Sequence, residues 1–188
     1  MNYQDYIWDL GGTLLDNYET STLAFVETLR IFGYQAEHDA VYKALKVSTD
    51  YAVNRFAPTE KDFLKCYKEN EAKRLASPVL FEGTREILQG ILSHGGRNFL
   101  ISHRDNQVLD ILEKAGIDSC FSDVITSANH FKRKPNPESI LYLKKKYAIH
   151  SGLVIGDRPI DIEAGQAAGL DTYLFDSMNN LKDFINLT

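Results

Sequence analysis

The chain has few of the residues that would mark a fibrous, disordered or disulfide-bonded protein. Its 188 residues include only 12 glycines, 5 prolines and 2 cysteines, whereas 44% of positions are hydrophobic. Cys66 and Cys120 lie far apart in the sequence and form no CxxC spacing, so we expect two free thiols in a reducing compartment. This profile excludes collagen-like and disordered proteins, and it predicts one globular domain, alone or with a smaller insert.

A basic surplus and long apolar runs are absent as well. The 21 Lys and Arg residues are outnumbered by 26 Asp and Glu residues, so the net charge is −5 and neither nucleic acid nor an anionic membrane is favoured as a partner. No apolar run approaches the roughly 20 residues that a membrane span needs. Residues 1–6 contain no Lys or Arg, so we expect no signal or transit peptide and predict a cytoplasmic protein.

Short apolar runs alternate with helical patterns over most of the chain. The runs expected to form buried strands are residues 4–8, 98–101, 124–126, 153–155 and 172–175. Helical spacing between the later runs predicts crossover helices, because parallel strands need such connections. The sequence therefore predicts an α/β fold with a doubly wound parallel sheet that is covered on both faces.

Residues 16–79 have a different character. Phe25, Leu29 and Phe32 recur at helical spacing before Gly33. Three further helical patterns follow, near residues 39–46, 49–56 and 60–75, without a convincing strand. We expect an all-helical domain over residues 16–79, inserted into an α/β domain that residues 1–15 and 80–188 form together.

Acidic residues follow two of the predicted strands. Asp9 comes directly after the first strand and precedes Gly11 and Gly12, whose N–H groups could approach an anion closely. Asp157 and Asp161 follow the strand at residues 153–155, and two carboxylates in one loop could hold a hard divalent cation. Each group could instead cap the helix that follows it. Ligands in such folds bind at the carboxyl ends of strands, which is where these acids lie.

Two other predicted loops carry a hydroxyl and a cation. Ser102 ends the strand at residues 98–101, and it could serve only as a helix cap. Lys134 precedes a predicted helix start, where a cation is unfavourable unless an anion lies nearby, although it could be a solvated residue of the basic turn 132–134. Unrelated caps would rarely occur as an acid, a hydroxyl, a lysine and an acid pair in this order.

This order of residue types resembles the haloacid dehalogenase-like (HAD) hydrolase superfamily. The residues that carry the resemblance are Asp9-x-x-Gly12-Thr13, Ser102, Lys134-Pro135 and Gly156-Asp157-x-x-x-Asp161-x-x-x-Gly165-x-x-x-Gly169. The helical insert is similar to the helical cap of the phosphoglycolate phosphatase-like and β-phosphoglucomutase-like members. The resemblance therefore implies a HAD-like core domain with an inserted cap domain.

The resemblance also implies a role for each motif residue. Asp9 would be the nucleophile that forms an aspartyl-phosphate, with Lys134 as its catalytic cation. The residues expected at the phosphate are Gly12, Thr13, Ser102, His103 and Lys134. The residues expected to hold Mg²⁺ are Asp9, Gly11 through its carbonyl, Asp157 and Asp161. Phosphoryl transfer depends mainly on such positioning and charge neutralisation.

Gly11 departs from the pattern of the family's phosphatases, which have a second Asp there as general acid and base. That role contributes roughly 10²–10⁴-fold to the rate, so its loss predicts an impaired or specialised enzyme. Such an enzyme should favour leaving groups that need no proton, such as those of acyl phosphates. His103, Asp16 and Tyr18 are possible replacements for the missing acid.

The sequence thus favours a Mg²⁺-dependent phosphatase that acts on a small phosphorylated metabolite through an aspartyl-phosphate. One alternative is a phosphate-binding regulatory protein that has lost turnover. Another is a phosphonatase-like enzyme that cleaves C–P bonds with Lys43 or Lys46 as an imine-forming amine, although no matching cap motif is present. Dehalogenation is not favoured, because haloacid dehalogenases have a bulky Tyr at the position of Gly11.

Overall fold

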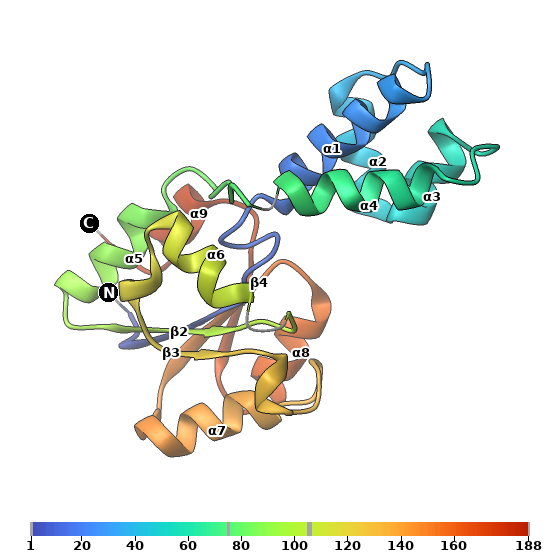
Figure 1. The fold of residues 1–188 in the computed structure, drawn as a ribbon. Helices are drawn as coiled ribbons and strands as arrows, with labels where there is room; N and C mark the ends of the chain where they lie inside the picture. The colour runs from blue at the N-terminus through green and yellow to red at the C-terminus, as the bar shows by residue number, and fades with distance from the viewer. Residues whose placement is uncertain (1, 75, 105–106, 188) are drawn as a thin grey trace. The chain divides into compact units, whose positions relative to one another are not determined.

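The computed structural model describes residues 2–74, 76–104 and 107–187, and the chain divides into two compact units. One unit combines residues 1–15 with residues 80–188, and the other spans residues 16–79. Figure 1 shows a sheet flanked by helices in the first unit and a group of helices in the second. The chain therefore leaves the α/β unit soon after its first strand and later returns to complete it.

The α/β unit is built on a parallel sheet whose described strands have the order β3-β2-β1-β4-β5. The strands are β1 (Asp5–Trp8), β2 (Arg97–Ile101), β3 (Phe121–Ile125), β4 (Gly152–Gly156) and β5 (Asp171–Leu174). The central strand β1 is buried along its whole length, as expected for a sheet covered on both faces. Because the strand order runs outward from β1 in both directions, the topological switch point lies between β1 and β4.

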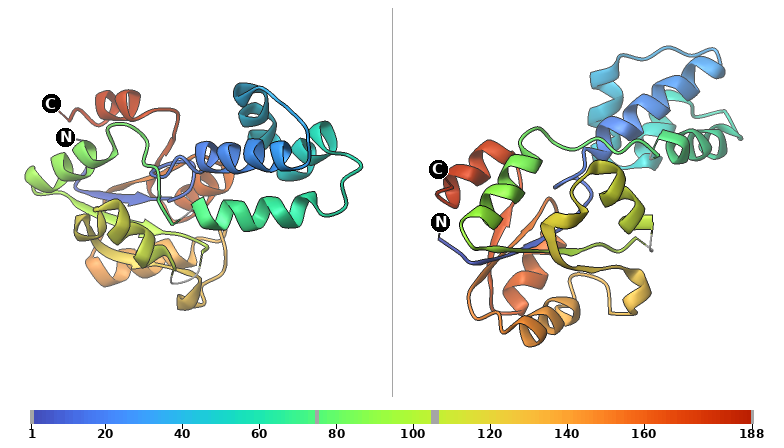
Figure 2. Two further views of the ribbon diagram at one scale, coloured as in Figure 1. Left: turned by 45° about the horizontal axis from the view of Figure 1, so that its top comes forward. Right: turned by 60° about the vertical axis from the view of Figure 1, so that its left-hand side comes forward.

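Helices cover both faces of this sheet (Figure 2). The helices on one face are α5 (Thr84–Ser93), α6 (Gln107–Ala115) and α9 (Met178–Phe184). Those on the other face are α7 (Glu138–Tyr147) and α8 (Pro159–Ala167). Trp8 and Leu100 belong to the first core cluster, whereas their strand neighbours Ile7 and Phe99 belong to the second. This alternation follows from the two-residue period of a strand.

The second unit has a hydrophobic core of its own. Its helices are α1 (Asn17–Ile31), α2 (His38–Val47), α3 (Thr49–Phe56) and α4 (Phe63–Arg74). The ring of Phe25 lies 4.8 Å from that of Phe63 and 5.1 Å from that of Tyr67, centroid to centroid, and all three side chains are buried. Asp16 begins α1, since its side chain accepts a hydrogen bond from the Glu19 N–H at 3.0 Å.

The predicted fold class, a doubly wound parallel α/β sheet with an inserted all-helical segment, is confirmed. Two short 3₁₀ turns, Asp118–Cys120 and Ser127–Asn129, flank β3. Helices α5 and α9 were not predicted from the sequence. None of the helices in the described ranges combines the length and the apolar character that a membrane-spanning helix requires.

Candidate active site

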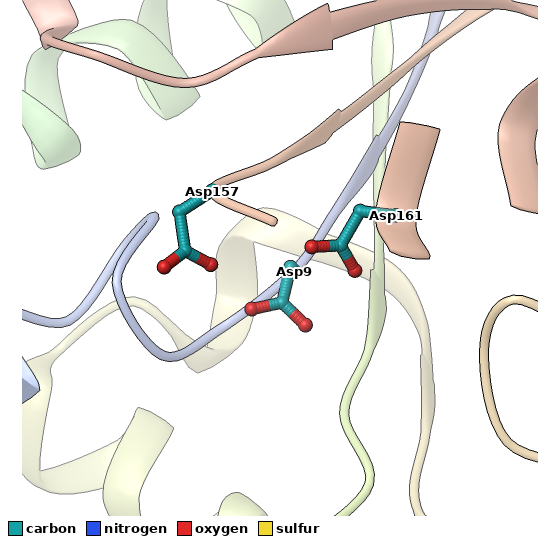
Figure 3. A group of neighbouring side chains, drawn as sticks. All are labelled: Asp9, Asp157 and Asp161. Atoms are coloured by element: carbon teal, nitrogen blue, oxygen red, sulfur yellow. The ribbon is translucent and has the colours of Figure 1, made fainter. Parts of the chain in front are cut away.

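Three aspartates from two neighbouring strands meet at the switch point of the sheet. Asp9 directly follows β1, Asp157 directly follows β4, and Asp161 lies in the first turn of α8. Each offers a carboxylate oxygen, and these oxygens all lie within 4.8 Å of one another (Figure 3). The pairing of β1 with β4 thus brings together acids that are about 150 residues apart in the sequence.

Two glycines leave the space that two of these carboxyl groups occupy. A Cβ atom on Gly12 would overlap the carboxyl group of Asp157, and Gly12 also has a φ of 83°, which disfavours other residues. A Cβ atom on Gly156 would overlap the side chain of Asp161. The close approach of the carboxylates therefore depends on glycine at both positions.

Lys134 neutralises part of this negative charge. Its Nζ lies 2.5 Å from Asp9 Oδ1 and 2.5 Å from Asp161 Oδ1, and its side chain is only 3% exposed. A buried ammonium of this kind needs paired carboxylates to offset its desolvation. One ammonium in contact with a group of three carboxylates still leaves the group negative.

Burial, and after it the neighbouring charges, shift the pKa values of the acids. Burial raises the pKa of Asp9, and Lys134 opposes that rise more strongly than Asp161 adds to it. Burial, followed by repulsion from Asp9 and Asp161, raises the pKa of Asp157 to about 6. Carboxyl groups that resist ionisation in this way gain most from a bound cation.

The chemistry of this group fits a hard divalent cation. Carboxylate oxygens are the side-chain ligands that Mg²⁺ favours, and three converge here. Asp157 Oδ1 is buried and has no hydrogen-bond partner among the described residues, although buried polar atoms are normally paired. A cation beside Asp157 would supply the missing partner and relieve the repulsion among the acids.

Two hydroxyl groups predicted at the phosphate are also buried. Thr13 Oγ1 is inaccessible to solvent and lacks a hydrogen-bond partner within the described part of the chain. Ser102 is 5% exposed, and its Oγ accepts a hydrogen bond from the Arg104 N–H at 3.3 Å. The Ser102 hydroxyl hydrogen is left for another acceptor, because this bond uses only the oxygen.

The Gly12 N–H, which the sequence suggested for an anion, has a hydrogen-bond partner in the structure. This group donates to the Leu15 carbonyl at 2.9 Å, so it is engaged within its own loop rather than directed to an anion. This hydrogen bond lies within the tight turn that the glycines allow, and the spacing of residues in the sequence does not predict it. Gly12 instead contributes the room it leaves for Asp157.

The structure also argues against His103 as a proton shuttle. Its Nε2 accepts the Lys134 main-chain N–H at 2.9 Å. Burial, followed by the charges of Lys134 and Arg133, lowers the pKa of His103 to about 4, so the ring is neutral near pH 7. No sequence signal predicts this contact, since the two residues are 31 positions apart and belong to different loops.

The other candidates for proton transfer belong to the helical unit. The Asp16 carboxylate caps α1, and the ring of Tyr18 lies edge-on to that of Tyr42 at 6.2 Å. Of the two lysines considered as imine-forming amines, Lys43 is exposed on α2 and Lys46 lies over the Tyr18 and Tyr42 rings. The α/β unit therefore contains the predicted phosphate and metal residues, whereas these four groups belong to the helical unit.

Comparison with known proteins identifies a family for almost the whole chain. The family profile described as haloacid dehalogenase-like hydrolase matches residues 6–175. A phosphoglycolate phosphatase of Vibrio parahaemolyticus is 25% identical, over 88% of this chain and 80% of that protein. The pyrophosphatase PpaX of Oceanobacillus iheyensis is 24% identical, over 98% of this chain and 90% of that protein.

Solved structures agree with this match. The crystal structure of a hydrolase from Streptococcus pneumoniae is 64% identical to the chain, with a TM-score of 0.96 and coverage of 99% of this chain and 100% of that one. A subfamily IA HAD-superfamily hydrolase from Geobacter sulfurreducens has the same fold at 20% identity, with a TM-score of 0.78 and coverage of 98% and 97%.

Proposed function

Because the chain belongs to the haloacid dehalogenase-like hydrolases, we propose that it is a Mg²⁺-dependent phosphatase that acts on a small phosphorylated metabolite. The predicted relationship to the phosphoglycolate phosphatase-like and β-phosphoglucomutase-like branch is confirmed, and relatives named as a phosphoglycolate phosphatase and a pyrophosphatase favour phosphorus chemistry. The observation that carries the proposal is the carboxylate of Asp9, paired with Lys134 at the switch point and grouped with Asp157 and Asp161. The two cysteines of the chain are free thiols, which suits the reducing cytoplasm, and we propose that the enzyme acts there.

In the proposed reaction Asp9 is the nucleophile. One of its carboxylate oxygens forms a bond to phosphorus as the bond from phosphorus to the leaving oxygen breaks, which gives an aspartyl-phosphate. Lys134 opposes the rise that burial gives the pKa of Asp9, and it would offset negative charge on the phosphoryl oxygens. Water then hydrolyses the aspartyl-phosphate and releases phosphate. Thr13 and Ser102 are proposed to hold phosphoryl oxygens during both steps.

Asp9, the Gly11 carbonyl, Asp157 and Asp161 would hold Mg²⁺ in this proposal. The bound ion would supply Lewis-acid stabilisation of the phosphoryl group. The chain's own contribution is to gather ionised carboxylates in a partly dry site. Gly12 and Gly156 make that possible through the room they leave.

Gly11 gives the proposed enzyme a narrower range of substrates. Glycine has no side chain that can protonate a leaving oxygen, and His103 is neutral and bonded through Nε2. Alkoxide leaving groups would therefore depart slowly, whereas the leaving groups of acyl phosphates and phosphoanhydrides need no proton. We propose that the helical unit is a cap domain that selects among such substrates and limits access of water.

A steady-state survey tests this proposal. We expect hydrolysis of some acyl phosphates, phosphoanhydrides or activated aryl phosphates that depends on Mg²⁺ and is reduced to background in Asp9→Asn. Asp5→Asn is the matched control, because Asp5 lies at the opposite end of the same strand, where it pairs with Arg97 at 2.6 Å. Asp5→Asn should lower stability while leaving kcat within about threefold of wild type.

The alternative of a phosphate-binding protein without turnover rests on Gly11 alone. Such a protein would bind Mg²⁺ and inorganic phosphate but would hydrolyse none of the substrates. Activity that persists in Asp9→Asn, or that does not require a divalent cation, would contradict the proposed phosphatase.

A further inference from the structure

His103 joins two loops of the α/β unit that are separate in sequence. It directly follows Ser102 at the end of β2, and its Nε2 accepts the main-chain N–H of Lys134, which lies in the loop before α7. The N···N distance of 2.9 Å is that of a well-formed hydrogen bond. The carbonyl of Arg104 accepts the Ser127 N–H at 2.8 Å, so a second bond links the same two parts of the chain.

This hydrogen bond requires a neutral imidazole. A nitrogen that accepts a hydrogen bond carries no proton, so the proton of the ring is on Nδ1. The pKa of His103 lies well below its usual range, because burial and the charges of Lys134 and Arg133 disfavour the imidazolium. The bond therefore persists at neutral pH.

The function proposed for Lys134 requires accurate placement of its ammonium group. Its Nζ must remain within 2.5 Å of two carboxylate oxygens, on Asp9 and Asp161, that come from different elements. A lysine side chain has four rotatable bonds, so its ammonium is accurately placed only if the main chain is held as well. The neighbouring residues Lys132, Arg133 and Pro135 are exposed. The Lys132 N–H donates to Glu138 and the Asn136 N–H to the Arg133 carbonyl, which are bonds within this loop and to the start of α7. The bond to His103 ties Lys134 itself to the end of β2.

We propose that His103 is a positioning residue that holds the main chain of Lys134, and through it the ammonium that pairs with Asp9 and Asp161. This inference rests on the proposed function: its effect on hydrolysis requires turnover, whereas its effect on phosphate binding requires only the phosphate site of that proposal. It gives His103 the role of a fixed neutral acceptor in place of a proton donor.

Two substitutions separate the acceptor from the bulk of the ring. His103→Gln can place Oε1 near the position of Nε2 and keep an acceptor, whereas His103→Leu keeps comparable volume without one. We expect His103→Leu to lower kcat about tenfold and to weaken binding of inorganic phosphate by a similar factor. His103→Gln should stay within about threefold of wild type in both measurements. His150→Leu, at an exposed site in the connection before β4, is the control and should change neither.

A double substitution tests whether His103 acts through Lys134. In a Lys134→Met background the ammonium is gone, so adding His103→Leu should not weaken phosphate binding further. The same phosphate titration reports on His103 even if the protein hydrolyses nothing. Equal losses from His103→Leu in both backgrounds would overturn the proposal, because His103 would then act independently of Lys134.

Long-range ¹H–¹⁵N NMR spectra of the imidazole test the hydrogen bond itself. The spectrum of the folded wild-type protein at pH 7 should show His103 protonated at Nδ1 and unprotonated at Nε2. A proton on Nε2, or equal phosphate affinities for His103→Leu and wild type, would overturn the assignment whatever the activity.

Discussion

Two partly buried carboxyl groups, one in each unit, have opposite environments. In the helical unit, Glu71 accepts hydrogen bonds from Ser21 at 2.6 Å, Tyr67 at 2.7 Å and Lys68 at 2.8 Å. Burial raises the pKa of Glu71, but these bonds outweigh it and hold the pKa below its ordinary value. In the α/β unit, burial and two neighbouring acids raise the pKa of Asp157 to about 6.

The opposite pKa shifts distinguish a carboxylate that stabilises the fold from one that is suited to binding a ligand. Glu71 obtains from its own unit the donors that an ionised carboxylate needs, so its charge contributes to stability. Asp157 has a buried oxygen with no partner in the described part of the chain, and it has two acidic neighbours. Such an arrangement is costly to folding and useful for binding a cation. A raised pKa, rather than burial alone, distinguishes the carboxyl group that we propose to bind a cation from the structural one.

The largest effect is expected from adding a fourth carboxylate beside Asp9, Asp157 and Asp161. Gly11 has no positive φ, in contrast to Gly12, so its backbone can accept another residue. Gly11→Asp should raise kcat for alkyl phosphates about 10²-fold by supplying a general acid. It should also lower the free energy of unfolding of the metal-free protein, because the added carboxylate is repelled by the three aspartates, none of which has, among the described residues, the set of donors that surrounds Glu71.

Gly11→Asn is the matched control for this change. It has nearly the same shape but no titratable proton, so alkyl phosphate hydrolysis should remain at the wild-type rate. Equal rates for Gly11→Asp and wild type would show that proton donation does not limit the reaction.

The next prediction is that neutralising the two carboxyl groups changes the free energy of unfolding in opposite directions. At pH 7 the metal-free protein must ionise Asp157 against its raised pKa. Asp157→Asn should therefore stabilise it by about 1–2 kcal/mol, less than the full shift implies because solvent screens a partly exposed group. Glu71→Gln should instead destabilise the protein by about 1 kcal/mol, through weaker hydrogen bonds. Urea unfolding of both variants in the presence of a chelator measures these differences.

The pH dependence of the free energy of unfolding is a second test of the same comparison. A raised pKa in the folded state means that stability falls as pH rises from about 4 to 6, so the advantage of Asp157→Asn should appear over that interval and remain above it. The lowered pKa of Glu71 acts in the opposite direction, and its contribution is lost only as pH falls through the folded-state value. An Asp157→Asn protein less stable than wild type at pH 7 would contradict this account.

The smallest effect concerns a matched pair of glycines with positive φ. Gly33, in the helical unit, has a φ of 81°, and no atom of the described residues lies within 4 Å of an added Cβ, so Gly33→Ala should cost only about 1 kcal/mol of backbone strain. Gly12→Ala adds a clash with the Asp157 carboxyl group to similar strain, so it should also weaken Mg²⁺ binding. Calorimetric titration with Mg²⁺ distinguishes the two variants. Similar Mg²⁺ affinities for both would show that the Asp157 carboxyl group does not need the space that Gly12 leaves.

Much of the fold could be predicted because its signals are local. The five apolar runs lie within three residues of the observed strand limits, since a sheet covered on both faces needs continuous apolar segments. The helical pattern at residues 49–56 matches α3. Helix α9 has only seven residues and was missed, because so short a segment contains too few turns for a clear apolar period.

The candidate site could be predicted only as a set of residue types. Strand ends meet at one edge of a parallel sheet, so Asp9, Ser102 and Asp157 were expected near one another without knowledge of side-chain directions. The place of Lys134 beside them was implied by the family resemblance. The bond from the Lys134 N–H to His103 and the internal bond of the Gly12 N–H depend on the exact path of each loop. Hydrogen bonds between distant loops leave no periodic trace in a sequence.

Trapping the covalent intermediate tests the central claim most directly. The protein should be mixed with Mg²⁺ and a hydrolysed acyl or aryl phosphate, quenched in acid during turnover and reduced with borohydride, which converts an aspartyl-phosphate into homoserine. Peptide mass mapping should then find homoserine at position 9, and none when Mg²⁺ is omitted. Homoserine at any other aspartate, or its absence at position 9 while substrate is being consumed, would contradict the assignment of Asp9 as the nucleophile.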